Sequence, residues 1–396
     1  MNSLVIAYYY SIESSSTGQI LRRFFPNLPE EFHSTIVTAK SQIDYSTNNC
    51  EVLGVRESSM AIMAEKVLRN LGMNDIMMTP DYYRYSWGIN ALRFAERNLS
   101  KRKFDYLHTI SFPSSSHLIG YKLKKQSGLP WVAQLYDPWH GNPYRPIVNQ
   151  YFVKKDGRYE SLVANYADLI ILPCKELVDD WHMRYGSLVE NKILELPFIT
   201  EPVADRSLEK KDDTLIISMI GSSNSKRMSS TFYEALRLFV EENPWAAEHM
   251  RVYQVGYITD AEKDIIKRFG LEDVVIQTGR LSENECVKYF QAADIFLAVD
   301  ADVPKNYFFP SKLLKYFSYQ RPILGLVTCN SVMSRELNQS GHVAISVDNV
   351  LGIKEYLNTA VTNYASLCGF DKDYRKKFYP SSVINLYISY LKRILF

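Results

Sequence analysis

The chain has 396 residues, of which 46% are hydrophobic and 23% charged, and its formal net charge is +2 at pH 7. This composition is globular, the length allows two domains with full cores, and the small net charge excludes a general electrostatic attraction to nucleic acids. The five cysteines show no CxxC spacing, which argues against a structural zinc site and a disulfide framework and indicates a reducing compartment.

The start of the sequence lacks the basic segment and the long apolar run of a signal peptide. No run approaches the ~18 apolar residues of a membrane span. We therefore expect a cytoplasmic protein that is soluble or attached only peripherally to the inner face of the membrane.

Short apolar runs alternate with helical patterns in the first half of the chain. Because this alternation is typical of βαβ units, it predicts a parallel, doubly wound sheet. The expected strands are 3–9, 33–39, 104–110, 129–135, 167–173 and 192–197, and the expected helices are 57–72, 86–101, 114–127 and 157–166.

The second half repeats this alternation more regularly. Its apolar runs show no polar alternation, which indicates strands that are covered on both faces of a parallel sheet. The expected strands are 214–220, 251–256, 274–279, 294–299 and 322–327, and each leads into a helical pattern.

The two halves are joined by PFITEPVADRSLEKKDD (197–213), which has two prolines and mixed charges and reads as a linker. We expect an N-terminal domain over 1–196, a linker over 197–212 and a C-terminal domain over 213–375. The amphipathic helix expected over 376–396 finishes the second domain or crosses back to the first. Two Rossmann-like domains then face each other across a cleft, with ligands outside the carboxyl ends of the strands.

Two glycine loops are candidates for binding an anion. Gly18 closes the small-residue loop SIESSSTGQ, whose backbone N–H groups would open onto an anion, although an ordinary N-cap is an equal alternative. Gly221 ends an expected strand and is followed by Lys226 and Arg227, a combination that suits a diphosphate. The alternative for these two cations is a solvated basic pair.

The stretch FFPSKLLKY (308–316) predicts a helix that begins with lysine rather than an acid. Pro310 precedes the helix, Ser311 is the expected N-cap, and Leu314 stands where a capping box would have an acid. Because a helix N-terminus is electropositive, Lys312 in the first turn indicates an anion at this end. The alternative is a lysine that points to solvent. The expected buried side is Leu313, Leu314 and Phe317.

Asp137 begins the loop DPWHGNPY at the carboxyl end of an expected strand. A carboxylate there would orient an acceptor hydroxyl or act as a base, whereas the alternative is a turn cap. His108 lies late in the strand FDYLHTI and is a second catalytic candidate, although a lone strand histidine is more often a core residue. No metal-ligand cluster or hydrolase signature occurs, so no metal is expected.

Several stretches together resemble a GT-B glycosyltransferase of the family 4 type, as found in bacterial capsule and O-antigen synthesis. The resemblance covers nearly the whole chain and depends on the order and spacing of the motifs. It is carried by PDYYRYSWGINALRFAERN, KFDYLHTISFPSSSHLIGYKLKKQSGLPWVAQLYDPWHGNPY, ESLVANYADLIILPC, IGSSNSKRMSSTFYEALRLF, QTGRLSENECVKYFQAADIFLAV and FFPSKLLKYFSYQRPIL.

This resemblance implies transfer of a hexose or N-acetylhexosamine from a UDP- or GDP-sugar to a glycan, usually a lipid-linked one. It implies retention of anomeric configuration, no metal and no cofactor other than the donor substrate. The acceptor then binds the N-terminal domain and the nucleotide sugar the C-terminal domain. The resemblance also assigns donor-binding positions: Gly18, Lys226, Arg227 and Lys312 near the phosphates, and Thr278, Gly279, Arg280 and Leu281 in the loop that receives the base.

The chain departs from this family at a pair of acids. Many members have two glutamates eight residues apart, one for the donor sugar and one for the ribose, and these positions are Tyr307 and Lys315 here. Sugar and ribose recognition must then differ, or Asp300 and Asp302 replace the pair. His108 is only an approximate match to the catalytic-site histidine of many members.

Three functions follow from these observations. An active glycosyltransferase is favoured, a nucleotide-sugar epimerase is disfavoured by the DPWHGNPY loop, and a catalytically silent GT-B scaffold subunit is supported by the missing acids. Two basic runs, 101–103 and 121–125, indicate contact of the acceptor domain with an anionic membrane, with solvated helix ends as the alternative. No nucleic-acid partner is expected.

Overall fold

The computed structural model describes residues 1–13, 15–57, 59–74, 76, 85–145, 147–200, 214–223, 227, 230–303 and 306–396. The chain divides into two compact units. Unit 1 comprises Met1–Thr200, Tyr307–Phe309 and Lys377–Phe396, and unit 2 comprises Glu201–Asn306 and Pro310–Lys376. The predicted linker lies outside the described residues from position 201 onward. The predicted cleft between the domains stays a prediction.

Unit 1 contains a seven-stranded parallel sheet of order β3-β2-β1-β4-β5-β6-β7, which confirms the predicted doubly wound architecture. The strand β3 was not predicted, because this edge strand mixes exposed and buried positions and lacks a continuous apolar run. The strands are β1 (Asn2–Ile6), β2 (His33–Ala39), β3 (Cys50–Val55), β4 (Tyr106–Ile110), β5 (Trp131–Gln134), β6 (Leu169–Leu172) and β7 (Ile193–Glu195).

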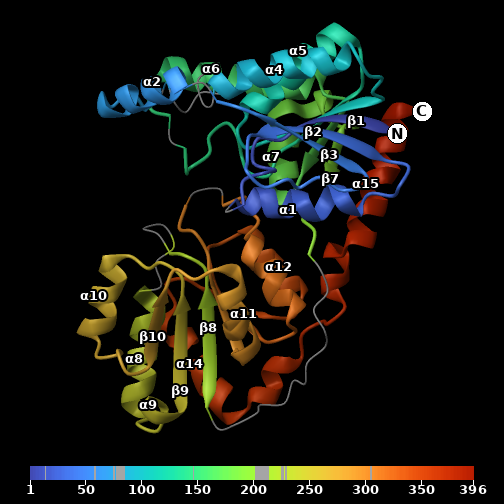
Figure 1. The fold of residues 1–396 in the computed structure, drawn as a ribbon. Helices are drawn as coiled ribbons and strands as arrows, with labels where there is room; N and C mark the ends of the chain where they lie inside the picture. The colour runs from blue at the N-terminus through green and yellow to red at the C-terminus, as the bar shows by residue number, and fades with distance from the viewer. Residues whose placement is uncertain are drawn as a thin grey trace. The chain divides into compact units, whose positions relative to one another are not determined.

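Helices cover both faces of this sheet, with α4 and α5 on one side and α1 on the other (Figure 1). The C-terminal helix α15 belongs to unit 1, where Tyr387 packs edge-on against Phe24 of α1. The helices are α1 (Ser16–Phe24), α2 (Ser59–Asn70), α4 (Tyr85–Leu99), α5 (Ser115–Ser127), α6 (Gln150–Tyr166), α7 (Lys175–Tyr185) and α15 (Pro380–Leu395), with short 3-10 turns η1 (Phe25–Asn27) and η2 (Gly186–Leu188).

Unit 2 contains a six-stranded parallel sheet of order β10-β9-β8-β11-β12-β13. All five expected strands are present, and β13 was missed because it is a four-residue edge strand with no buried position. The strands are β8 (Leu215–Ile220), β9 (Met250–Val255), β10 (Val275–Gly279), β11 (Ile295–Val299), β12 (Ile323–Val327) and β13 (Val343–Ser346).

The helices of unit 2 complete its core. Phe232 and Leu236 of α8 and Leu357 of α14 are fully buried in one apolar cluster with the strands. The helices are α8 (Ser230–Glu242), α9 (Ala246–His249), α10 (Asp260–Arg268), α11 (Glu283–Ala292), α12 (Ser311–Ser318), α13 (Val332–Gln339) and α14 (Val350–Thr362), followed by 3-10 turns η3 (Tyr364–Cys368) and η4 (Tyr374–Phe378). Within the described residues, none of the helices is long and apolar enough to span a membrane.

Candidate functional site

Three neighbouring strands of unit 2 end at glycines. Gly221 follows β8, Gly256 follows β9 and Gly279 ends β10, and all three have positive φ angles, of 124°, 127° and 68°. The N–H of Gly221 donates to the carbonyl of Val255 (2.7 Å), and that of Gly256 donates to Gly279 (3.0 Å). A Cβ atom on Gly256 would lie 2.9 Å from the carbonyl carbon of Gly221. These glycines therefore allow the backbone segments after β8, β9 and β10 to approach each other closely at the carboxyl edge of the sheet. The only sequence signal for Gly256 is its position after an expected strand.

Lys312 lies directly beside Gly221. A Cβ atom on Gly221 would lie 3.6 Å from Nζ of Lys312. The helix α12 begins one residue earlier than predicted, because the N–H of Leu313 donates to the carbonyl of Pro310 (2.9 Å), which makes Pro310 the N-cap. Ser311 is therefore not the N-cap, and no side chain caps this helix end. The start of this helix therefore lies beside the glycine that follows β8.

Tyr316 fixes the position of this helix. Its hydroxyl accepts a hydrogen bond from the N–H of Ile220 (2.9 Å) and donates to the carbonyl of Leu297 (3.3 Å), and its ring stacks on Phe296 with 4.3 Å between centroids. Since residues four apart lie on the same face of a helix, this anchor directs Lys312 toward the end of β8. The buried side predicted for the helix is also present: Leu313, Leu314 and Phe317.

Two cations meet at this helix end. Burial, together with the nearby charge of Arg227, lowers the pKa of Lys312 to about 8, while Asp300 opposes the shift. Lys312 makes no hydrogen bond or ion pair within the part of the chain that the structure describes, and Nε of Arg227 is buried without a hydrogen-bond partner there. Partly buried cations without partners, beside an uncapped helix N-terminus, are suited to an anion. Lys226 lies outside the described residues.

Asp300 and Asp302, the possible replacements for the glutamate pair, differ in their burial. Asp300 is buried, which raises its pKa, and it accepts hydrogen bonds from Nδ2 of Asn306 (2.6 Å) and the hydroxyl of Thr328 (3.3 Å). It therefore ties together the loops after β11 and β12. Asp302 is exposed.

Tyr307 and Lys315, which stand at the positions of the glutamate pair, both contact other residues of the chain. Lys315 pairs with Glu283 of α11 (3.0 Å) and lies over the ring of Phe290. Tyr307 belongs to unit 1, where its carbonyl accepts from Sγ of Cys174 (3.6 Å). Lys315 is therefore engaged on the α11 side of its helix.

The predicted base-binding loop lies at the carboxyl end of β10, next to Gly256. The hydroxyl of Thr278 donates to the carbonyl of Gly279 (3.0 Å), and the guanidinium of Arg280 lies 5.7 Å from the ring centroid of Tyr257. Arg280 is exposed and Leu281 is half-buried. The structure thus brings this loop to the same sheet edge as Gly221, and its role in binding a base stays a prediction.

Gly18 is the third residue of α1 rather than part of an open loop. Its N–H donates to the hydroxyl of Ser15 (3.2 Å), and a Cβ atom would lie 2.4 Å from the carbonyl oxygen of Tyr9. The glycine is therefore needed for close packing of α1 on the preceding loop. Its N–H donates to the N-cap residue Ser15, which agrees with the alternative of an ordinary helix cap. A contact with donor phosphates stays a prediction.

The loop DPWHGNPY is held firmly by α6. Nε1 of Trp139 donates to Asp156 (2.9 Å), and the backbone N–H of His140 donates to Glu160 (2.9 Å). The hydrogen bond between Nδ1 of His140 and Asp156 (3.4 Å) raises the pKa of His140. Asp137 is half-buried at the start of this loop, three residues after β5, so it lies at the carboxyl edge as predicted.

His108 is fully buried inside unit 1. Nε2 contacts the side-chain oxygen of Gln134 (3.0 Å), and Nδ1 contacts the hydroxyl of Tyr387 (3.4 Å). Burial lowers the pKa of His108 to about 3. Both ring nitrogens have protein partners and the side chain is not exposed, so this geometry supports the core-histidine alternative.

Buried polar groups that the sequence did not single out gather after β4 and β5. The hydroxyls of Ser114, Ser115 and Ser116, at the start of α5, are buried without hydrogen-bond partners among the described residues, as is Nε2 of His117. The hydroxyl of Tyr136 is in the same situation. Buried polar groups normally have partners, so this edge of unit 1 is a candidate for a ligand rich in hydroxyls. A run of three serines before a histidine is the only sequence signal.

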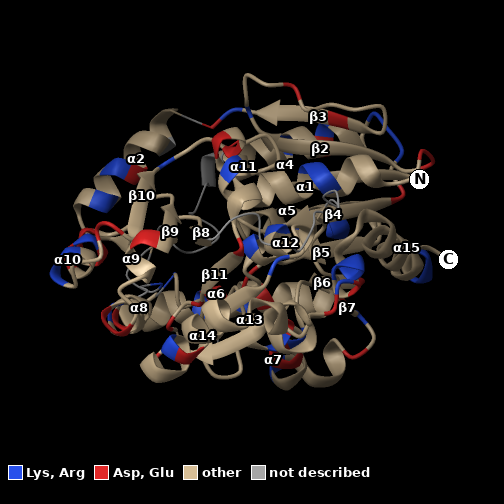
Figure 2. Cartoon of the chain, turned by 90° about the horizontal axis from the view of Figure 1, so that it is seen from below, with Lys and Arg blue, Asp and Glu red and all other residues tan. Residues whose placement is uncertain are grey.

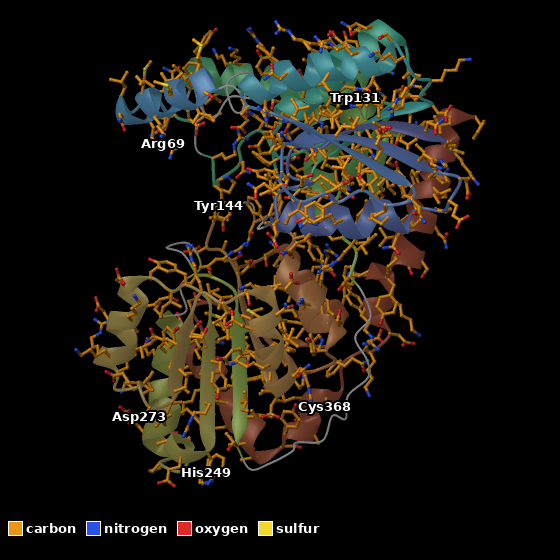
Figure 3. The ribbon with its side chains drawn as sticks, viewed as in Figure 1. Arg69, Trp131, Tyr144, His249, Asp273 and Cys368 are labelled. Atoms are coloured by element: carbon orange, nitrogen blue, oxygen red, sulfur yellow. The ribbon has the colours of Figure 1, made fainter. Side chains whose placement is uncertain are left out.

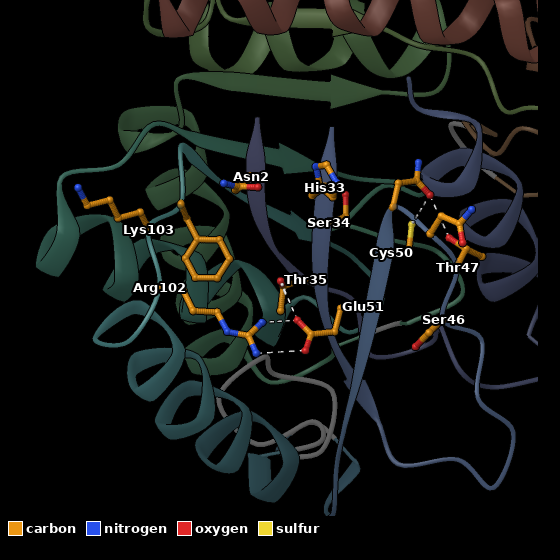
Figure 4. Close-up of a pocket in the computed structure, with 13 residues that line it drawn as sticks. Asn2, His33, Ser34, Thr35, Ser46, Thr47, Cys50, Glu51, Arg102 and Lys103 are labelled. Carbon is orange, nitrogen blue, oxygen red and sulfur yellow. Dashed lines mark hydrogen bonds and ion pairs between the residues drawn. The ribbon is translucent and has the colours of Figure 1, made fainter. Parts of the chain in front are cut away.

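A pocket of about 500 Å³ lies at the opposite, amino edge of the unit 1 sheet (Figure 4). Glu51 and Arg102 form an ion pair in it, and Asn49 donates to the carbonyls of Phe25 (3.3 Å) and Leu28 (3.0 Å). Because ligands of doubly wound sheets bind at the carboxyl edge, this pocket does not coincide with the predicted sites. Among the described residues, no group of acids, histidines and cysteines is arranged to hold a metal ion.

No protein-family model matches the sequence, and no curated protein matches it significantly. Solved structures do match over the whole length. Sucrose-phosphate synthase from Thermosynechococcus elongatus has a TM-score of 0.71 at 14% identity and covers 100% of this chain and 99% of its own. The chain has the GT-B fold.

Two further structures share this fold. HepE from Anabaena, in complex with UDP-glucose, has a TM-score of 0.64 at 12% identity over 99% of this chain and 100% of its own. WaaG, a glycosyltransferase involved in lipopolysaccharide biosynthesis, has a TM-score of 0.60 at 14% identity over 99% of this chain and 98% of its own. At such low identity the similarity establishes the fold, whereas the activity must be argued from the site.

Proposed function

We propose that the chain is a glycosyltransferase that moves a hexose or an N-acetylhexosamine from a UDP- or GDP-sugar to a glycan acceptor. In this proposal the acceptor is lipid-linked and belongs to surface-polysaccharide synthesis, as in capsule or O-antigen. Anomeric configuration is retained, and neither a metal nor another cofactor takes part. Structures with this fold include HepE in complex with UDP-glucose and WaaG, which is involved in lipopolysaccharide biosynthesis.

One observation carries the donor side of the proposal: Lys312 and Arg227 meet at the uncapped end of α12, beside Gly221. A diphosphate there would receive helix N–H groups and two positive charges. The depressed pKa of Lys312 indicates that its charge is poorly stabilised without an anion. The loop from Thr278 to Leu281, at the end of β10, is then available to the base, since it lies at the same edge.

The acceptor side of the proposal rests on unit 1. Asp137 would orient or deprotonate the acceptor hydroxyl, because it begins a loop that α6 holds through Trp139 and His140. The unpartnered buried groups from Ser114 to His117 would supply hydrogen bonds to sugar hydroxyls at the same edge of the sheet.

The experiment is a thermal-shift screen of the full chain against UDP, GDP and a panel of their sugars, followed by a turnover assay on each sugar that raises the melting temperature. A ligand that binds only the folded state raises apparent stability by mass action. We expect one nucleotide sugar to stabilise the protein and to be consumed when a glycan acceptor or water is present. A screen without any stabilising nucleotide would contradict the proposal.

A second candidate, a catalytically silent scaffold subunit, is favoured by one observation. The two family acid positions carry Tyr307 and Lys315, and Lys315 is paired with Glu283. A silent subunit would bind a nucleotide in the thermal-shift screen and turn over none of the sugars. The same experiment therefore separates the two candidates.

A further inference from the structure

The pocket at the amino edge of the unit 1 sheet is built from segments that are far apart in the chain. These are the starts of β1, β2 and β3, the loop that leads into β3, and the segment just before β4 (Figure 4). Figure 3 labels Trp131, the first residue of β5, at this edge, and Tyr144, in the loop after β5, on the carboxyl side. The volume of about 500 Å³ falls within the roughly 300–1,000 Å³ of small-molecule sites. The pocket is therefore large enough for a ligand and is separate from the proposed acceptor edge.

The loop before β3, which forms one wall, is fixed by hydrogen bonds. The N–H and the hydroxyl of Ser46 both donate to Asp44 (2.9 and 2.7 Å), and the same hydroxyl accepts from the N–H of Val52 (3.1 Å). At the other end of the loop, the amide of Asn49 donates to two backbone carbonyls of the segment before β2. Because this wall is already ordered, a ligand would bind without the cost of ordering it.

The opposite wall is fixed by an ion pair. Both terminal nitrogens of the Arg102 guanidinium donate to the carboxylate of Glu51, one of them over 3.2 Å, and the hydroxyl of Thr35 donates to the same carboxylate (3.3 Å). The hydrogen bond from Arg102 lowers the pKa of Glu51, so this acid is charged at neutral pH. Figure 2 shows β2 and β3 side by side, with acidic and basic residues in the segments around them.

Four exposed polar side chains of the lining have no hydrogen bond or ion pair with the residues that the structure describes: Asn2, His33, Asn48 and Lys103. An amide or a neutral imidazole both donates and accepts, an ammonium group donates three hydrogen bonds, and a paired carboxylate still has lone pairs to offer. The pocket therefore presents donors and acceptors from several sides. Such a set suits a ligand with several hydroxyl groups.

The charge of the lining favours an anionic ligand. Two basic residues, Arg102 and Lys103, stand against one acid, Glu51, which gives a net charge of +1 with His33 neutral. Since Glu51 neutralises Arg102, the ammonium of Lys103 is the charge that remains for a ligand. The basic run 101–103, for which membrane contact or solvation was expected from the sequence, thus supplies two residues of a pocket wall. Next to them, Phe104 adds an aromatic ring to the lining, which suits the apolar face of a sugar ring.

We propose that this pocket is a second saccharide site, which binds a hexose that carries a carboxylate or a phosphate group. Lys103 contacts the anionic group, and the amides of Asn2 and Asn48 bind hydroxyls. The carboxylate of Glu51 accepts from a further hydroxyl, and Phe104 lies against the sugar ring. This site goes beyond the proposed transfer reaction and does not depend on the nucleotide-sugar site. Two sources share this chemistry: an acidic sugar unit of a glycan and a free sugar phosphate.

The test is a ligand-observed NMR titration of the full chain with four probes: glucuronic acid, glucose 6-phosphate, glucose and inorganic phosphate. We expect at least one of the two anionic sugars to bind about tenfold or more tightly than both glucose and phosphate, because it alone combines the charged contact with the hydroxyl contacts. Tighter binding of glucuronic acid identifies a glycan unit as the source, and tighter binding of glucose 6-phosphate a free sugar phosphate. Absence of binding by both would overturn the proposal. So would glucose or phosphate alone binding as tightly as the anionic sugars.

Matched variants locate the binding. Lys103→Met removes the cation from the lining, whereas Lys101→Met removes an exposed lysine two residues away that does not line the pocket. We expect Lys103→Met to weaken binding of the anionic sugar about tenfold or more and Lys101→Met to leave it unchanged. Asn48→Ala should weaken anionic sugars and glucose by the same factor, because it removes only a hydroxyl contact. Since these side chains are exposed, the variants should keep the melting temperature of the parent. If Lys103→Met binds the anionic sugar like the parent, the proposal is wrong.

Two further measurements separate this pocket from the sites of the transfer reaction. Saturating UDP should not displace the anionic sugar, and Asp137→Asn should bind it like the parent. Displacement by UDP, or loss of binding in Asp137→Asn, would place the sugar in the donor or acceptor site and overturn the proposal. Calorimetry should show the same UDP affinity in Lys103→Met as in the parent. A chain that binds the anionic sugar through Lys103 but binds no nucleotide would support this pocket and contradict the donor site, so the two failures are distinct.

Discussion

The backbone of Gly221 and the ammonium group of Lys312 lie so close that a methyl group on the glycine would be 3.6 Å from Nζ. The two residues come from elements 91 positions apart in the chain, the end of β8 and the start of α12. Tyr316 joins these elements, because its hydroxyl bonds to the backbone of Ile220. The glycine, the lysine and the helix N-terminus therefore form one site, and the first three predictions concern it.

Replacing Lys312 by methionine should weaken nucleotide binding and stabilise the free protein. A charge-assisted contact is worth roughly 1.5–3 kcal/mol, so affinity for the UDP or GDP that the parent binds should fall about ten- to a hundredfold. Stability should rise by roughly 1–3 kcal/mol at pH 7, because an unpaired, partly buried charge is removed from a helix N-terminus. Calorimetric titration and thermal unfolding measure the two effects.

Lys315→Met is the control, because this lysine lies one turn further on α12 and pairs with Glu283. It should leave nucleotide affinity unchanged. If both lysine variants bind nucleotide as the parent does, the diphosphate does not bind at this helix end.

Nucleotide affinity should decrease as pH rises above about 8. Lys312 has a pKa of about 8 in the free protein, so it is largely neutral at pH 9.5 and must take up a proton before it can bind a diphosphate. The diphosphate itself is ionised throughout this range. We expect a decrease of up to about tenfold per pH unit, with proton uptake visible as a buffer-dependent heat of binding. A flat profile in the parent would contradict the proton uptake by Lys312, and an equal decrease in Lys312→Met would show that another group titrates.

The same pKa fixes the sign of the stability effect. Between about 8 and the ordinary lysine value of 10.5, the unfolded chain binds more protons than the folded chain, so Lys312 makes stability rise with pH. The gain in the free energy of unfolding caused by Lys312→Met should therefore be largest at pH 7 and smaller at pH 9.5.

Gly221→Ala should damage both the fold and the site. Gly221 has a φ of 124°, which an alanine adopts only with strain of about 1–3 kcal/mol, and the added methyl group would stand against Lys312. Gly270→Ala is the control, since Gly270 also has a positive φ, 63°, but has no atom within 4 Å of an added Cβ. Both variants should melt earlier than the parent, and only Gly221→Ala should lose nucleotide affinity. Equal affinity losses would assign the effect to strain alone.

The sequence was sufficient to predict the strands that are buried on both faces of a sheet. β11 reads as a continuous apolar run because both of its faces are covered, whereas β3 and β13 lie at sheet edges and lack such a run. The N-cap of α12 was placed one residue late because Ser311 is a good capping residue, and propensity alone does not show that Pro310 already accepts the first bond.

The site was predicted where a residue type has one strong physical reason to be at its position. Lys312 in a first helical turn is unfavourable without an anion, so the sequence singled it out. The sequence could not show that Tyr316 anchors the helix or that Gly256 closes on Gly221, because both depend on residues distant in the chain. The sequence could not decide between the catalytic and the core alternatives for His108, because burial, which contributes to lowering its pKa to about 3, is a tertiary property.

Asp137→Asn should reduce turnover more than donor binding. If Asp137 orients or deprotonates the acceptor, kcat should fall by roughly a hundredfold or more, with nucleotide affinity nearly unchanged. Asp273→Asn is the control, because Asp273 is exposed, lies just before β10 and has no proposed role in either site. Loss of nucleotide affinity together with kcat, accompanied by a lower melting temperature, would identify Asp137 as a structural turn residue.

His140→Gln should cost more stability at pH 6 than at pH 8.5. The hydrogen bond with Asp156 raises the folded-state pKa of His140 above its unfolded value of 6.5. A group whose folded pKa is raised stabilises the protein below the unfolded pKa and loses this contribution as pH rises through the folded pKa. Since the His140 side chain is 33% exposed, solvent screening limits the difference to under about 1 kcal/mol.

Chemical unfolding of the parent and of His140→Gln at both pH values measures this difference. Asp156→Asn is expected to flatten the same pH dependence. A larger cost of His140→Gln at pH 8.5 would mean that the neutral imidazole holds the DPWHGNPY loop and that the charged form weakens it.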